Sequence, residues 1–128
     1  MSALPARGID SYRQTEIQSR SPLELVVMLY DGAIRFLRQS AEHMRAGDRE
    51  RARERMRRAE AVIDELNGTL DMTYGEVAER LRAIYLFSKR RLIRANLDFD
   101  PAKVDGVARM LAELRDAFAQ VVERTAGE

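Results

Sequence analysis

Apolar residues recur at alternating steps of three and four along four segments of this chain, and this spacing restricts the fold more than any other feature. It places apolar side chains on one face of an α-helix, and that face must be buried against other helices. The positions concerned are Leu23, Val27, Tyr30, Ile34, Leu37, Ala41 and Met44; Ala52, Met56, Ala59, Ile63, Leu66 and Leu70; Val77, Leu81, Ile84, Ser88, Leu92 and Ala95; and Val104, Val107, Leu111, Leu114, Phe118 and Val121. Because short connections separate the segments, neighbouring helices must run in opposite directions. We therefore predict an all-α protein with an antiparallel up-down four-helix bundle.

The predicted helices begin and end at residues that are typical of helix caps. Ser21 to Glu24 form a capping box with proline at the first helical position. Gly47 is suited to end the first helix and Asp48 to cap the second. Thr73 to Glu76 have the pattern of another capping box, and Asp100-Pro101 repeats the cap-plus-proline arrangement. These signals predict where all four helices start.

Residues 1–20 lack the helical periodicity and contain Pro5 and Gly8. We predict a flexible N-terminal segment at 1–20 and a single four-helix-bundle domain at 21–128. Tyr12 and Ile17 are apolar side chains in the first segment, and we expect them to anchor it near the first helix.

The residue content argues against catalysis and metal binding. The chain has no cysteine and one histidine, His43, on a mostly polar helical turn. Cysteine-based zinc sites and helical di-iron sites therefore lack their ligands. No phosphate-binding loop, dinucleotide-binding motif or nucleophile elbow is present. We predict no enzymatic activity and no cofactor.

Charge and hydropathy exclude two further classes. The net charge is +1, and the arginine-rich run at 49–58 is interrupted by Glu50 and Glu54 and has no aromatic residue for base stacking. We predict no nucleic-acid partner. Since no apolar stretch has the length of a signal peptide or a membrane span, we also predict no membrane insertion and a cytoplasmic protein.

The first helix carries a second apolar row beside its core face. This row contains Leu25, Leu29 and Phe36, with Gly32 between them. A glycine inside a helix costs about 0.5–1 kcal/mol relative to alanine, which is tolerable where another chain must approach closely. Two interpretations remain open: the helix is buried on two sides within the bundle, or the row forms a docking groove.

The third helix has a similar excess. Leu86, Ile93 and Leu97 lie roughly opposite its core face, and Arg82, Arg90 and Arg94 flank them as a basic rim. Stray surface apolar residues are tolerated in soluble proteins, but two helices with a second apolar row favour a docking surface for another amphipathic segment.

A series of short motifs runs in order through nearly the whole chain. They are Tyr12, Ile17, Ser21-Pro22, Leu25, MLYDGAI at 28–34, IDEL at 63–66, LD at 70–71, GEVA at 75–78, IYLF at 84–87 and RAN at 94–96. Together they resemble the flagellin-specific export chaperones of the FliS family, and MLYDGAI after a capped Ser-Pro start is the most specific of them.

The resemblance implies a small helical cytoplasmic chaperone. It would bind the disordered C-terminal segment of flagellin, prevent premature polymerisation and aid delivery to the flagellar type III secretion apparatus. Components of the export gate and a co-chaperone or regulator are further partners that it implies. We expect the protein itself to be a monomer or a weak dimer. The alternative is a self-assembling helical bundle with a structural or adaptor role.

Combining the second apolar rows with the resemblance gives a predicted client-binding groove. It comprises Tyr12, Ile17, Leu25, Met28, Leu29, Gly32, Phe36, Leu86, Ile93 and Leu97, with Arg82, Arg90 and Arg94 as its basic rim.

Overall fold

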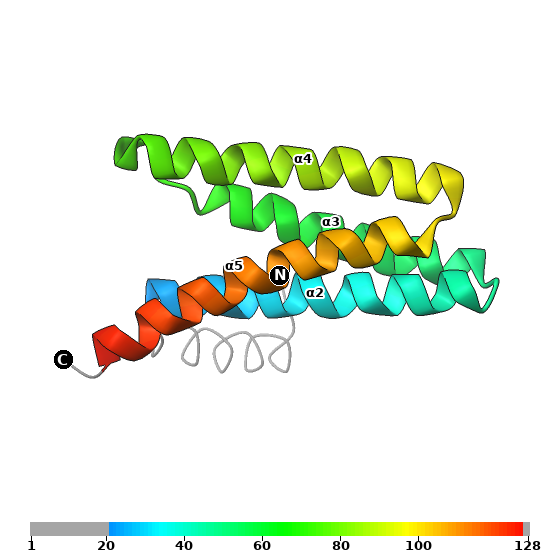
Figure 1. Cartoon of the computed structure of the whole chain (residues 1–128), viewed down its shortest axis with the longest axis horizontal. Helices are drawn as coiled ribbons and strands as arrows, with labels where there is room; N and C mark the ends of the chain where they lie inside the picture. The colour runs from blue at the N-terminus through cyan, green and yellow to red at the C-terminus, as the bar shows by residue number, and fades with distance from the viewer. Residues whose placement is uncertain (1–20, 127–128) are drawn as a thin grey trace, which may run out of the picture.

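The computed structural model describes residues 21–126, which form four long helices and one short 3-10 helix. Helix α2 spans Pro22–Arg45, α3 spans Arg49–Gly68, α4 spans Glu76–Asp98 and α5 spans Pro101–Ala126, while η1, Met72–Tyr74, lies between α3 and α4. Successive long helices run in opposite directions (Figure 1), and residues 21–126 contain no strand. The predicted all-α, up-down four-helix bundle is confirmed. The segment at 1–20 lies outside the described residues.

The four helices do not cover one another equally. Helix α2 packs extensively against both α3 and α5, whereas the contacts of α4 with α3 and α5 are much sparser. Figure 1 shows α4 on the side of the bundle away from α2. Helix α2 is therefore the most enclosed helix, and α4 has the most free surface.

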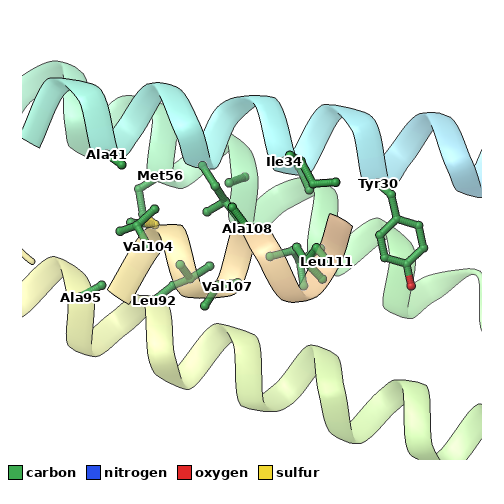
Figure 2. Packing of buried hydrophobic residues seen from close by; sticks show 14 of the residues in the cluster. Tyr30, Ile34, Ala41, Met56, Leu92, Ala95, Val104, Val107, Ala108 and Leu111 are labelled. Atoms are coloured by element: carbon green, nitrogen blue, oxygen red, sulfur yellow. The ribbon is translucent and has the colours of Figure 1, made fainter. Parts of the chain in front are cut away.

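Large apolar side chains from all four helices fill the core (Figure 2). The largest that are fully buried are Tyr30, Leu37, Ile63, Leu66, Tyr85, Leu92, Leu111, Val104 and Val107. Burying each such side chain contributes about 1.5–3 kcal/mol, so this shared core is the main source of stability.

Polar contacts add to the pairing of α2 with its two neighbours. The buried Ser40 hydroxyl of α2 donates to the main-chain carbonyl of Ala52 in α3 at 2.7 Å. On the other side, Asp31 accepts from Arg115 of α5 at 2.8 Å, and Arg45 pairs with Asp105. Because the two ion pairs are largely exposed, they contribute little to the stability of the bundle, and their main effect is on the alignment of the helices.

Three of the four predicted cap sites are confirmed, and one is wrong. The Ser21 and Asp48 side chains accept from the third following main-chain N–H, and Asp100 accepts from Ala102. Before the third long helix, Asp71 caps η1, because its carboxylate accepts from both the main-chain N–H and the hydroxyl of Thr73. Thr73 is thus held inside η1, and α4 begins only after Gly75, whose φ of 67° suits glycine.

Most predicted core positions are buried, but one end of the bundle is loosely packed. Predicted core residues that are only half-buried are Leu23, Val27, Leu70, Leu81, Ile84, Leu114 and Phe118, and two are exposed, Val77 and Val121. All of them lie near the starts of α2 and α4 or the ends of α3 and α5, which meet at the same end (Figure 1). In α4 the buried positions here are Ala78 and Tyr85 in place of Val77 and Ile84. We call this region the open end.

Candidate functional site

Helix α4 carries a row of large apolar side chains on its free surface. The exposed fractions are 43% for Leu86, 55% for Ile93 and 72% for Leu97, and Phe87 beside the row is 53% exposed. The placement of these three residues away from the core agrees with the sequence prediction. We call Leu86, Ile93 and Leu97 the α4 outer row.

Basic side chains flank the α4 outer row, and the segment that carries this row contains no acidic residue. From Leu81 to Leu97 the chain has no aspartate or glutamate. Arg82 and Arg90 are exposed and form no ion pair within residues 21–126, while Arg94 lies 3.3 Å from Asp98. The three arginines of the predicted basic rim are exposed, and its role in binding stays a prediction.

The second row of α2 is placed differently from the α4 outer row. Leu25, Leu29 and Phe36 are half-buried, and both Leu29 and Phe36 pack against the core. The guanidinium groups of Arg35 and Arg58 lie 5.4 and 5.9 Å from the centre of the Phe36 ring, so cations from α2 and α3 cover this ring. Phe36 therefore lies at the α2–α3 interface, and the second row of α2 is more buried than the α4 outer row.

Gly32 and Met28 are the members of the α2 set that face outward. A Cβ atom built on Gly32 would meet no heavy atom within 4 Å, so packing inside the described bundle does not require glycine here. Met28 is 43% exposed and lines a hollow of about 340 Å³ between α2 and α5, together with Val27 and Val122. This surface of α2 is open to a ligand.

A larger apolar cleft lies at the open end, and the sequence reasoning did not include it in the site. Its volume is about 410 Å³. It is lined by Pro22, Leu23, Val26, Thr69, Leu70, Asp71, Tyr74, Val77, Ala78, Leu81, Tyr85 and Phe118. Several of these residues stand at core-type positions near helix ends, where neighbouring helices no longer cover them. We call this the end cleft.

An aromatic cluster adjoins the end cleft. The hydroxyl oxygens of Tyr30 and Tyr85 lie 2.5 Å apart, and the Tyr30 ring stacks on Phe118 with 5.6 Å between ring centres. Tyr85 and Phe118 are both part of the cleft wall. Burial raises the pKa of both hydroxyls above the usual range for tyrosine, so both stay protonated at neutral pH.

Two members of the predicted groove, Tyr12 and Ile17, lie outside the described residues. Asp31, part of the MLYDGAI motif, has its partner in Arg115. The side-chain oxygen of Asn96, from the RAN motif, is buried without a hydrogen-bond partner among residues 21–126.

Metal coordination and membrane insertion find no support in the described part of the chain. Residues 21–126 contain no cluster of three or more His, Cys, Asp or Glu side chains that could hold a metal ion. None of the helices within that range is long and apolar enough to cross a bilayer.

The bundle, the α4 outer row and the end cleft define a helical protein with an exposed apolar row and an apolar cleft. Comparison with known proteins gives the family. The family described as "Flagellar protein FliS" matches residues 5–125. The chain is 33% identical to the flagellar secretion chaperone FliS of Bacillus subtilis over 88% of this chain and 84% of the relative. It is also 33% identical to the protein of the same name from Salmonella typhimurium, over 91% and 90%, and 30% identical to that of Vibrio cholerae, over 89% and 88%. The chain belongs to the FliS family. Since its relatives are named chaperones, this membership agrees with the prediction that the chain is not an enzyme.

Proposed function

We propose that this protein is a flagellar secretion chaperone that binds the disordered C-terminal segment of flagellin. The observation that carries the proposal is the α4 outer row, which exposes large apolar side chains in a chain of the FliS family. In this role the protein acts in the cytoplasm, keeps flagellin from polymerising early and helps to deliver it to the export gate. A co-chaperone or regulator is a further partner that such a surface can accommodate.

The energetics of the α4 outer row suit a client that folds on binding. Leu86, Ile93 and Leu97 retain between 43% and 72% of their surface in water. Covering them would contribute about 1 kcal/mol per side chain, against the ordering entropy of the client. The end cleft and the outward surface around Gly32 and Met28 give the same client two further contact areas. An extended segment wrapping around the bundle can reach all three.

The basic rim favours a client with acidic side chains over a second copy of this chain. Pairing two α4 outer rows about a two-fold axis would bring the Arg82, Arg90 and Arg94 side chains of both copies close together. Such like-charge juxtaposition opposes association, whereas acidic residues flanking the apolar anchors of a client would be attracted. Self-assembly through α4 is therefore the weaker of the two functions, and we expect a monomer at micromolar concentration.

The N-terminal segment has a proposed role in the same cycle. Tyr12 and Ile17 would cover apolar surface near α2 until the client arrives, and such a cap lowers the apparent affinity for the client by competition. Removing residues 1–19 is then expected to strengthen binding of a flagellin peptide.

Calorimetric titration tests the proposal. We expect a peptide spanning the C-terminal segment of the cognate flagellin to bind saturably at one to one, with a negative heat-capacity change. Ile93→Asp places a charge in the α4 outer row and is expected to weaken binding about tenfold or more. Ala61→Asp is the matched control, because Ala61 is exposed on α3 and is not part of the α4 outer row. Equal affinities of the two variants, or no binding by the wild type, would refute the proposal.

A further inference from the structure

The wall of the end cleft is apolar except for a few side chains, and most of those already have partners. The Thr69 hydroxyl donates to the carbonyl of Leu66 at 2.7 Å. The Asp71 carboxylate accepts from Thr73. Tyr85 also lines the cleft, and its buried hydroxyl bonds to that of Tyr30.

The tyrosine pair has one more donor than it uses. Each protonated hydroxyl has one hydrogen, so Tyr30 and Tyr85 bring two hydrogens to a single mutual bond. Neither hydroxyl has another hydrogen-bond partner within residues 21–126. When Tyr30 donates to Tyr85, the hydrogen of Tyr85 is left without an acceptor in the described part of the chain.

The Tyr30–Tyr85 hydroxyl pair is not an effective way to stabilise the fold. Both side chains are almost fully buried, Tyr30 at 0% and Tyr85 at 2% exposed. Two phenylalanines would fill the same space and leave no polar hydrogen unmatched, and exchanges of this kind are often neutral or stabilising. Tyr85 is one of the residues that line the end cleft, so the hydroxyl pair belongs to a side chain that borders a hollow.

We propose that the Tyr85 hydroxyl donates a hydrogen bond to a carbonyl oxygen of the flagellin segment when that segment fills the end cleft. Tyr30 donates to Tyr85 in this arrangement, which polarises the Tyr85 hydroxyl and strengthens its bond to the client. The apolar walls bind bulky side chains without fixing their register, and the hydroxyl fixes it. This inference rests on the proposed chaperone function and adds a specificity-determining residue to it.

Four variants, titrated with the cognate flagellin peptide, test the role of Tyr85. Tyr85→Phe removes the donor, Tyr30→Phe removes its partner, a double variant removes both, and Ser40→Ala is a control that removes a buried hydroxyl outside the cleft wall. We expect Tyr85→Phe and the double variant to bind about three- to tenfold more weakly. Tyr30→Phe should lose less affinity than Tyr85→Phe, because Tyr30 only strengthens the bond that Tyr85 makes, and Ser40→Ala should stay within about twofold of the wild type.

Urea unfolding of the same proteins separates recognition from folding. The double variant should be at least as stable as the wild type, so its weaker binding cannot come from a disturbed bundle. If Tyr85→Phe alone fails to fold, the double variant replaces it in the binding test. Wild-type affinity in the double variant would overturn the inference. Equal losses for Tyr30→Phe and Tyr85→Phe would overturn it too, because they would indicate a packing effect. Absence of binding by the wild type itself would instead refute the chaperone proposal on which the inference rests.

Discussion

Replacing Gly32 by alanine separates the stability of the bundle from its capacity to bind. The glycine lies well inside α2, where it costs about 0.5–1 kcal/mol relative to alanine. Since an added Cβ would meet no neighbouring side chain within 4 Å among residues 21–126, no steric penalty from the bundle offsets the gain in helix propensity. We therefore expect Gly32→Ala to raise the free energy of unfolding by about 0.5–1 kcal/mol, equivalent to a rise of about 2–6 °C in Tm.

The same substitution should have the opposite effect on binding. If the flagellin segment approaches the α2 backbone at Gly32, an added methyl group overpacks that contact and weakens binding by about fivefold or more. Gly106→Ala is the matched control. Gly106 also lies inside a helix, and its added Cβ would meet only the end of the Arg109 side chain, at 3.9 Å. The control should gain similar stability and bind the peptide unchanged.

Urea unfolding followed by circular dichroism measures the first effect, and calorimetric titration with the flagellin peptide measures the second. A Gly32→Ala protein that is less stable than the wild type would refute the inference that the site is open. A more stable protein with unchanged affinity would show that the client does not approach the backbone there, and Gly32 would leave the proposed site.

Three further expectations concern the core, the ionisable groups and the basic rim. Ser40→Ala removes the buried bond to the Ala52 carbonyl and should lower the free energy of unfolding by about 0.5–1.5 kcal/mol in urea, without changing affinity for the client. Burial raises the pKa of the Glu60 carboxyl above its model-compound value of 4.5. A raised carboxyl pKa costs stability above the unfolded-state value, so Glu60→Gln should be more stable than the wild type at pH 7. This difference should vanish below about pH 4, where both states are protonated, and a gain that persists at pH 3 would contradict the assignment. The double change Arg82→Gln with Arg90→Gln should weaken peptide binding at low salt and flatten its dependence on salt concentration; an unchanged salt slope would exclude a role for the basic rim.

The fold could be predicted from the sequence because each helix has one continuous core face and clear start signals. The prediction failed at the start of α4, where Thr73 to Glu76 have the spacing of a capping box. Spacing alone does not show which side chain accepts a hydrogen bond from a given main-chain N–H. Asp71, two residues before Thr73, accepts from the Thr73 N–H. A carboxylate that accepts from both the N–H and the hydroxyl of one residue outcompetes a threonine cap.

The candidate site was only partly predictable, because periodicity identifies the direction in which a side chain points and not what lies there. Val77 and Leu23 are at core-type positions, but at the open end the neighbouring helices leave them beside a cleft. Helix packing, and not the local pattern, decides whether such a position is filled by the protein or left for a ligand.

The two surplus apolar rows show the same limit more sharply. Both rows contain large apolar residues outside the core face, and the sequence gives no reason to treat them differently. Helix α2 lies between α3 and α5, so its extra residues Leu29 and Phe36 are used to pack against a second neighbour. Within residues 21–126 no helix covers the outer side of α4, so Ile93 and Leu97 stay exposed beside Arg90, which forms no ion pair in that range, and Arg94, which pairs with Asp98. An apolar row that the protein itself covers contributes to folding, whereas one that it leaves uncovered costs solubility unless a partner covers it. The uncovered row on α4 is therefore the stronger indication of a client, and acidic residues beside its apolar anchors are what that client should have.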